Sequence, residues 1–390
     1  SRTAGVPTTM NVSANGSVYD ALTKAIATLG ETGLQVAAYH LGELVVDTWA
    51  GVADPETGRA VDGDTLFTVF SMSKGVTATI THRLVERGIL AYDEPLATWW
   101  PAFAAHGKGG ITVRHALSHR AGLPGFKGLA FADQPSLAAT GRNLEEATPD
   151  WAPGASMAYH GMTFGTLLGR TIELATGKPF AQVLHEEVTG PANIPDLWCG
   201  IPADPSIHAR VATLHPGNAP DSSTGLRPMD DAERATLTET SARRNRPEFR
   251  EGCMPAGGMI GTARAFARHY ASMRPDGLDG TRLLNPETIA QASVAYFGDD
   301  GKHIAWTNRM GLGYALGAGT HQDCGVTIVA PWADAFGHTG LGGSLAMYCP
   351  SQDLAVAMTK NALHPGRLEC FTWDRALRAV CDGLGIAYEA

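Results

Sequence analysis

The sequence predicts an α/β fold in which both ends of the chain supply strands to one sheet, with a mostly helical segment inserted between them. Apolar-rich runs typical of strands occur near residues 34–53 and again beyond residue 325. The stretch between them contains mainly helical patterns, joined by loops rich in proline and glycine. Strands from both ends must meet in one sheet to bury their apolar faces.

This pattern divides the chain into two domains. We expect an α/β domain made of residues 1–74 and 255–390, and a mostly helical domain with long loops made of residues 75–254. A ligand-binding cleft is then expected between the two domains, where such sites are common.

The amino-terminal elements follow from their spacing and their end signals. Residues 18–29 carry apolar side chains at helical spacing and stop at Gly30. Residues 34–53 are expected to form two strands separated by a turn at residues 40–43. Residues 73–87 contain no proline and are followed by a glycine, which predicts a helix.

The middle of the chain is expected to be helical, apart from one long loop. Helical patterns occur at residues 113–119, 164–175 and 180–188. Residues 199–255 are polar and rich in proline, and a loop of that length is usually a lid or a binding loop. It carries a basic run that we interpret as a solvated surface feature rather than as a grip for an acidic substrate: Arg243, Arg244 and Arg246.

The carboxyl-terminal part returns to strands. A helix is expected at residues 263–273 and a final helix at residues 367–384. Between them, three apolar runs predict strands at residues 325–329, 344–348 and 354–359.

The composition excludes several classes of protein. The 390 residues are 44% hydrophobic and 18% charged, which is too apolar for a disordered chain. The formal net charge of −9 argues against nucleic acid as a partner, because phosphate binding needs a concentrated basic surface. No apolar run approaches the roughly 18 residues of a membrane span, so none is expected.

The six cysteines indicate neither a disulfide framework nor a metal site, because the sequence has no CxxC pair and no metal-type clustering. We expect reduced, mostly buried thiols, no metal and no cofactor, which favours a cytoplasmic location. The first residues lack the apolar core of a signal peptide. Since the sequence does not begin with Met, a removed signal peptide stays open.

The sharpest local motif is Ser71-Met72-Ser73-Lys74, at the start of an expected helix. Ser71 and Lys74 are one turn apart and share a face. A serine hydroxyl becomes a good nucleophile when a base takes its proton, and a lysine can be that base if desolvation or nearby positive charge lowers its pKa. The motif alone is weak, because it equally fits a helix-capping serine beside a solvated lysine.

Two further motifs strengthen the assignment. Tyr159 follows a turn in the middle of the chain, and His338-Thr339-Gly340 precedes an apolar strand. In this order, SxxK, tyrosine and HTG resemble the serine β-lactamase and penicillin-binding protein superfamily, in particular its class C-like branch with family VIII carboxylesterases and related acyltransferases. The resemblance covers roughly residues 20–360 and implies an antiparallel sheet flanked by helices.

The resemblance also implies roles for individual residues. Ser71 would be the acylated nucleophile, Lys74 its proton-handling partner and Tyr159 a second base. The backbone N–H groups of Ser71 and Leu341 would form the oxyanion hole. By position, the substrate would be bound by residues near the tyrosine and in the HTG triplet: His160, His338, Thr339 and Gly340.

Two departures from the family pattern favour an esterase. Lactamases of this family carry Tyr-x-Asn and Lys-Thr-Gly, whereas this chain has Gly161 in place of the Asn and His338 in place of the Lys. The lost residues would hold the amide and carboxylate of a β-lactam, and a neutral histidine suits an uncharged ester better. We therefore expect a serine hydrolase that forms an acyl-enzyme with a small-molecule ester or amide, released by water or by an alcohol or amine acceptor.

Several alternatives stay open at this stage. Within the enzymes they are an acyltransferase or amide-forming transacylase in natural-product biosynthesis, a D-amino-acid peptidase and a weak β-lactamase. Outside the enzymes, the chain could be a sensor that a β-lactam acylates without turnover. His115 and His119 have the spacing of metal ligands on a helix, but they lack a carboxylate partner nearby and are interpreted as structural.

Overall fold

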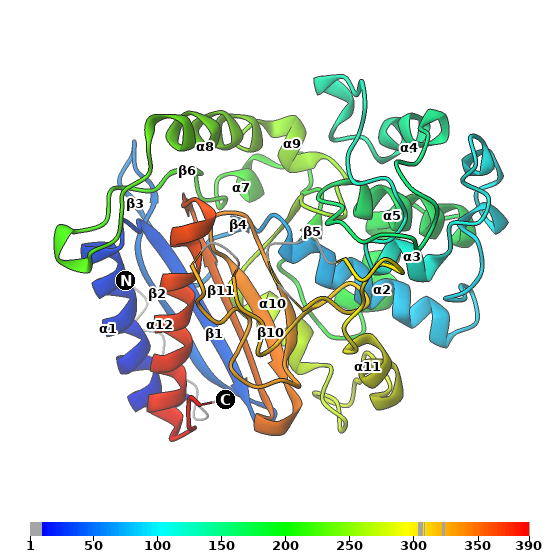
Figure 1. Ribbon diagram of the computed structural model, residues 1–390. Helices are drawn as coiled ribbons and strands as arrows, with labels where there is room; N and C mark the ends of the chain where they lie inside the picture. Colours follow the sequence, from blue (N-terminus) through cyan, green and yellow to red (C-terminus); the bar gives the residue numbers. More distant parts are fainter. Residues whose placement is uncertain (1–9, 303–306, 308, 322–323, 390) are drawn as a thin grey trace.

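Across residues 10–302, 307, 309–321 and 324–389, which the computed structural model describes, the central element is an antiparallel sheet of seven strands with helices on both faces (Figure 1). The strand order is β3-β2-β1-β11-β10-β9-β8. The bounds are β1 Gly33–His40, β2 Glu43–Asp54, β3 Arg59–Ala60, β8 Ala315–Leu316, β9 Phe336–Thr339, β10 Leu345–Cys349 and β11 Leu354–Lys360. The two chain ends meet at the pairing of β1 with β11, as the sequence predicts.

The two faces of the sheet bury different cores, because successive side chains of a strand point to opposite faces. Along β11, Leu354, Val356 and Met358 belong to one apolar cluster. The intervening Ala355 and Ala357 belong to another. All seven residues of β11 are buried, and its first five form a continuous apolar run and not an alternation.

Helices from both ends of the chain cover the first face. α1 (Val12–Thr28) and α12 (Gly366–Leu384) lie side by side against the sheet, in blue and red in Figure 1. α10 (Ala263–Ala271) packs on the opposite face against β1, β10 and β11. The wide apolar stripe of α10, which includes Phe266 and Tyr270, is what closes that core.

The inserted part of the chain is mostly helical. Its elements and the helix that follows α10 are α3 Val113–Leu117, α4 Leu137–Glu146, α5 Thr163–Thr176, α6 Phe180–Leu184, α7 Pro205–His208, α8 Asp231–Arg244, α9 Pro247–Glu251 and α11 Pro286–Ala292. A small sheet joins β4 Phe67–Thr68, β7 Met259–Gly261 and β5 Leu197–Cys199, and β6 His215–Pro216 pairs with β12 Ala362–Leu363.

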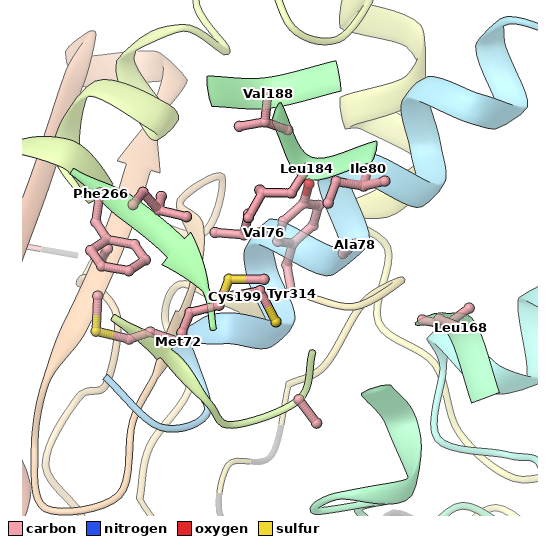
Figure 2. Packing of buried hydrophobic residues seen from close by; sticks show 14 of the residues in the cluster. Met72, Val76, Ala78, Ile80, Leu168, Leu184, Val188, Cys199, Phe266 and Tyr314 are labelled. Atoms are coloured by element: carbon pink, nitrogen blue, oxygen red, sulfur yellow. The ribbon is translucent and has the colours of Figure 1, made fainter. Parts of the chain in front are cut away.

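Helix α2 (Met72–Glu86) runs through the middle of the molecule and is buried over nearly its whole length. It packs against α5, α6 and β9, with Val76 and Ile80 near Leu184 and Tyr314 (Figure 2). Three threonines on this helix are buried without cost because each hydroxyl donates to a carbonyl: Thr77 to Pro255, Thr79 to Gly75 and Thr81 to Thr77. The Thr77 bond ties α2 to the segment that leads into β7.

Some sequence expectations were wrong in detail. Residues 325–329 form no strand, apart from a single bridge between Thr320 and Thr327. The strand β9 lies at residues 336–339 instead, where Gly337 has low strand propensity and pairing with β8 and β10 imposes the extended shape. The expected long loop at residues 199–255 contains the 14-residue helix α8, which begins with a capping box at Asp230 and Glu233.

Other elements agree with the sequence to within a few residues, except that α1 starts at Val12, capped by the side chain of Asn11. Within the described residues, no helix combines the length and the apolar character that crossing a membrane would require.

Candidate active site

Ser71 stands at the start of α2, directly after Phe70, whose backbone is strained. Phe70 has a φ of 49°, in the left-handed region that a bulky residue rarely adopts. Ser71 follows as the N-cap, but its side chain makes no capping hydrogen bond. Ser73 fastens the turn instead, because its hydroxyl donates to Phe70 O at 2.6 Å and accepts from Met259 N at 3.0 Å. The Ser71 hydroxyl is therefore available for chemistry.

Lys74 is fully buried, and its amine faces the Ser71 hydroxyl. The Nζ atom lies 2.8 Å from Ser71 Oγ and donates to the carbonyl oxygens of Gly161 at 2.6 Å and Ala256 at 2.9 Å. Burial, aided by the positive charge of Arg244, lowers the Lys74 pKa well below its usual value. The alternative of a capping serine beside a solvated lysine does not fit this geometry.

A neutral amine matches these three contacts atom for atom. An uncharged lysine has two N–H groups and one lone pair. In the structure Lys74 Nζ donates to Ser71 Oγ; when the amine is neutral, the carbonyls of Gly161 and Ala256 occupy its two N–H groups and its lone pair can accept the hydroxyl proton of Ser71. The arrangement can therefore take a proton from the serine.

Arg244, at the end of α8, was interpreted from the sequence as a solvated residue, and the structure corrects this. Its guanidinium donates to Gly257 O at 3.0 Å and lies over the ring of Phe70, 5.3 Å from the ring centre. Burial lowers its pKa to about 10, so it remains a cation at neutral pH. Its neighbours Arg243 and Arg246 do pair on the surface, with Glu239 and Glu248.

Tyr159 lies on the other side of the Lys74 amine. The Lys74 Nζ is 4.9 Å from the centre of the Tyr159 ring. The ring also packs against His119 at 4.8 Å and faces His338 at 6.2 Å, measured between ring centres. His119 is held in place because its Nδ1 accepts from the His160 N–H at 2.9 Å. The structure thus brings Ser71, Lys74 and Tyr159 together.

The HTG triplet closes the site from β9. His338 is fully buried, its Nδ1 lies 2.7 Å from Thr339 O, and burial together with the charge of Lys74 lowers its pKa to about 3. It is neutral at physiological pH. Gly340 is required by close approach, because a Cβ built there would lie 2.1 Å from Val69 O. The end of β9 therefore lies directly against the segment that leads into Ser71.

Two backbone N–H groups, where the end of β9 meets the start of α2, can donate hydrogen bonds to an oxygen that becomes negative. Leu341 follows Gly340, and its side chain is 42% exposed. Neither the Ser71 N–H nor the Leu341 N–H donates to another residue in the described part of the chain. Both amides belong to the two segments that Gly340 brings together.

Two histidines from the sequence analysis have internal roles. His160 is fully buried, its Nε2 accepts from Leu123 N at 3.0 Å, and its Nδ1 lies 2.6 Å from Ala158 O. Both ring nitrogens of His160 are thereby engaged with the backbone, and a role of His160 in substrate binding stays a prediction. The Nδ1 of His115 accepts from Thr112 N at 3.1 Å, as part of a capping box at the start of α3.

Three groups at the site were not identified from the sequence. The carbonyls of Gly161 and Ala256 belong to the backbone, so no residue type in the sequence marks them. Arg244 cannot be told from a surface arginine by its sequence neighbours.

Comparison with known proteins is consistent with this geometry. The family model described as Beta-lactamase matches residues 21–380. The chain is 32% identical to the protein named Esterase/beta-lactamase LipL of Mycobacterium tuberculosis, over 85% of this chain and 77% of that protein.

Two solved structures extend the similarity to the fold. A penicillin-binding protein homologue from Caulobacter crescentus has a TM-score of 0.78 at 30% identity, and a family VIII carboxylesterase has a TM-score of 0.80 at 27% identity. Each alignment covers 96% of this chain and 98% of the other. The chain therefore belongs to the beta-lactamase family and is a serine hydrolase with the beta-lactamase fold.

Proposed function

We propose that the protein is a carboxylesterase that forms a covalent acyl-enzyme on Ser71 with small-molecule esters. The contact that carries the proposal is the one between Lys74 Nζ and Ser71 Oγ, 2.8 Å long and made by a lysine whose pKa is lowered. The names of the relatives, which include esterases, support the same reaction class.

The first half-reaction acylates the serine. Ser71 Oγ attacks the ester carbonyl carbon while its proton passes to the Lys74 amine. The N–H groups of Ser71 and Leu341 hold the oxygen that becomes negative, a contribution worth about 10²–10³ in rate per donor. The bond to the leaving alcohol then breaks, and Tyr159 gives that alcohol its hydroxyl proton and takes the proton held by Lys74 in return.

The second half-reaction releases the acid. A water molecule gives a proton to the Tyr159 and Lys74 pair as its oxygen attacks the acyl carbon, and the same proton returns to Ser71 Oγ when the acyl bond breaks. An alcohol or amine in place of water would give transesterification or amide formation by the same steps.

The polar character of the pocket favours an uncharged ester over a β-lactam. His338 is neutral and buried, and Gly161 offers a backbone carbonyl that is already bound to Lys74. Neither residue supplies the ammonium or the side-chain amide that the lactamase pattern uses. We assign Thr339, at the partly buried end of β9, and Gly340 to the substrate-binding wall.

The test is the p-nitrophenyl acetate turnover of Ser71→Ala, with circular dichroism as a check on folding. We expect the variant to lose turnover, whereas Ser222→Ala, at an exposed serine, should keep it. Intact-mass spectrometry should show a transient acetyl adduct on the wild-type protein and none on Ser71→Ala. Undiminished turnover by a folded Ser71→Ala would refute the mechanism, and a lasting adduct without turnover would favour the sensor.

A further inference from the structure

A cluster of soft side chains lies behind the candidate active site, on the far side of the Gly342–Gly343 turn. His321, Cys324 and Cys370 place one ligand atom each within 4.8 Å of one another. Cys370 lies on the first turns of α12, and the other two lie in the segment before β9. His321 is 4% exposed and Cys370 is 5% exposed, so the cluster is mostly buried.

The carboxylate of Glu369 lies beside the cluster. Glu369 Oε1 lies 3.7 Å from His321 Nε2, and Glu369 Oε2 accepts from Gly342 N at 3.0 Å. His321, Glu369 and Cys370 also line one small cavity, together with Thr339 and Gly343. One nitrogen and two sulfurs therefore converge on one place beside a cavity, and the Glu369 carboxylate lies next to the histidine.

The charges of these groups favour a cation there. Cys324 and Cys370 are in contact, with 2.8 Å between their sulfur atoms. Two thiolates beside a carboxylate would repel one another strongly, and a divalent cation converts that repulsion into attraction.

We propose that His321, Cys324 and Cys370 bind a zinc ion, with the Glu369 carboxylate as the partner of His321. One imidazole nitrogen and two thiolate sulfurs are ligands that zinc prefers, and a water molecule can fill the fourth position of the tetrahedron. Binding releases the two thiol protons to solvent, so the ion and the two thiolate charges cancel.

The ion requires a modest adjustment of the cysteines. Zinc–sulfur bonds of about 2.3 Å in a tetrahedron hold two sulfurs roughly 3.8 Å apart, about 1 Å more than in the thiol pair. Cys324 is half-buried on a loop, and rotation about its Cα–Cβ bond can supply this movement. Cys370 is fixed by α12 and needs to move less.

The site would act on the segment that carries Leu341. Gly342, the next residue, donates to Glu369 and also bridges to His364. An ion that anchors Glu369 would fix this turn to α12, and with it the N–H group that we assign to the oxyanion. We infer a structural zinc site that supports the active site without touching the substrate.

The test is the zinc content of the reduced, full-length protein after loading with zinc chloride and extensive dialysis. We expect about one zinc ion per chain by mass spectrometry of the metal. Cobalt loading should give the charge-transfer band of a thiolate ligand and the visible bands of tetrahedral cobalt. Cys324→Ser and Cys370→Ser should abolish both signals.

The second cysteine pair provides a matched control. Cys199 and Cys253 have sulfur atoms 3.8 Å apart, and they are not part of the cluster found among the described residues. Cys253→Ser should therefore keep the zinc and the cobalt bands. Circular dichroism of each variant separates loss of the ion from loss of the fold, and Ser71→Ala should still bind zinc.

Two results would overturn the proposal. The first is a folded, reduced wild-type protein that retains no zinc after dialysis. The second is a Cys324–Cys370 disulfide, detected by mass spectrometry as the loss of two hydrogens, in a protein that takes up no metal after reduction. Neither result bears on the acyl-enzyme, because the esterase test does not depend on the metal.

Discussion

Lys74 Nζ lies 2.8 Å from Ser71 Oγ while its two other contacts are backbone carbonyls. Among the described residues, no carboxylate pairs with this lysine to hold it charged, and burial and the nearby Arg244 both lower its pKa. This is the opposite of an ordinary surface lysine, whose ammonium is solvated. A buried base one turn from a helix-initial serine is the relationship on which the reaction depends.

Lys74→Met should leave a folded protein with little esterase activity, because methionine fills the buried volume but takes no proton. We expect kcat/KM to fall by about 10²–10⁴-fold. The measurement is p-nitrophenyl acetate turnover, and Lys24→Met on α1 is the control. Wild-type turnover by Lys74→Met would show that Ser71 is activated by another group.

Tyr159→Phe removes a hydroxyl and keeps the ring that packs on His119. If the hydroxyl transfers protons, kcat should fall by about 10²–10⁴-fold with little change in the thermal midpoint. A longer-lived acyl adduct by intact mass would locate the loss in deacylation. Unchanged kcat in the folded variant would assign Tyr159 a purely structural role.

Arg244 should tune the pH dependence through Lys74. The amine acts as a base when it is neutral, so the rate rises with pH through the Lys74 pKa, which the Arg244 cation lowers. Arg244→Gln removes the cation, raises that pKa and should move the acidic limb of the kcat/KM profile to higher pH. Arg243→Gln, at the adjacent surface residue, should leave the limb in place. A limb unmoved in both variants would contradict the coupling.

The backbone donor at Leu341 can be removed by proline, which lacks an N–H group. Leu341→Pro should lower kcat by about 10²–10³-fold. Leu341→Ala keeps the N–H group and trims only a partly exposed side chain, so its rate should stay near that of the wild type. Equal rates in the two variants would remove Leu341 from the oxyanion hole.

Acid should destabilise the fold through its buried histidines. Burial lowers the pKa of five of them from 6.5 to between about 3 and about 4: His82, His160, His269, His338 and His364. Between those values and 6.5 the unfolded chain binds more protons, so the free energy of unfolding falls as pH drops below 6.5.

Urea titrations between pH 7 and pH 4.5 measure this loss. His269 is fully buried with burial as the cause of its shift, so His269→Gln should reduce the slope by up to about 1.4 kcal/mol per pH unit. His106 is exposed, and His106→Gln should leave the slope as it is. Equal slopes in both variants would show that His269 does not contribute.

The sequence by itself determined the class of fold and the residue types of the reaction. Helical spacing fixes Ser71 and Lys74 on one face of α2, since residues three apart are neighbours on any helix. The apolar runs of β1 and β11 likewise require a buried sheet, whichever partner each strand finds. Local periodicity is sufficient for both conclusions.

Tertiary structure alone decided the features that depend on distant segments. The strand state of β9 comes from pairing, the lowered pKa of Lys74 comes from burial and from the charge of Arg244 on α8, and Cys370 meets Cys324 across 46 residues. Backbone carbonyls leave no mark in a sequence, and burial and contact are properties of the packed chain. The shifted pKa values of the site therefore follow from the tertiary structure and not from the sequence.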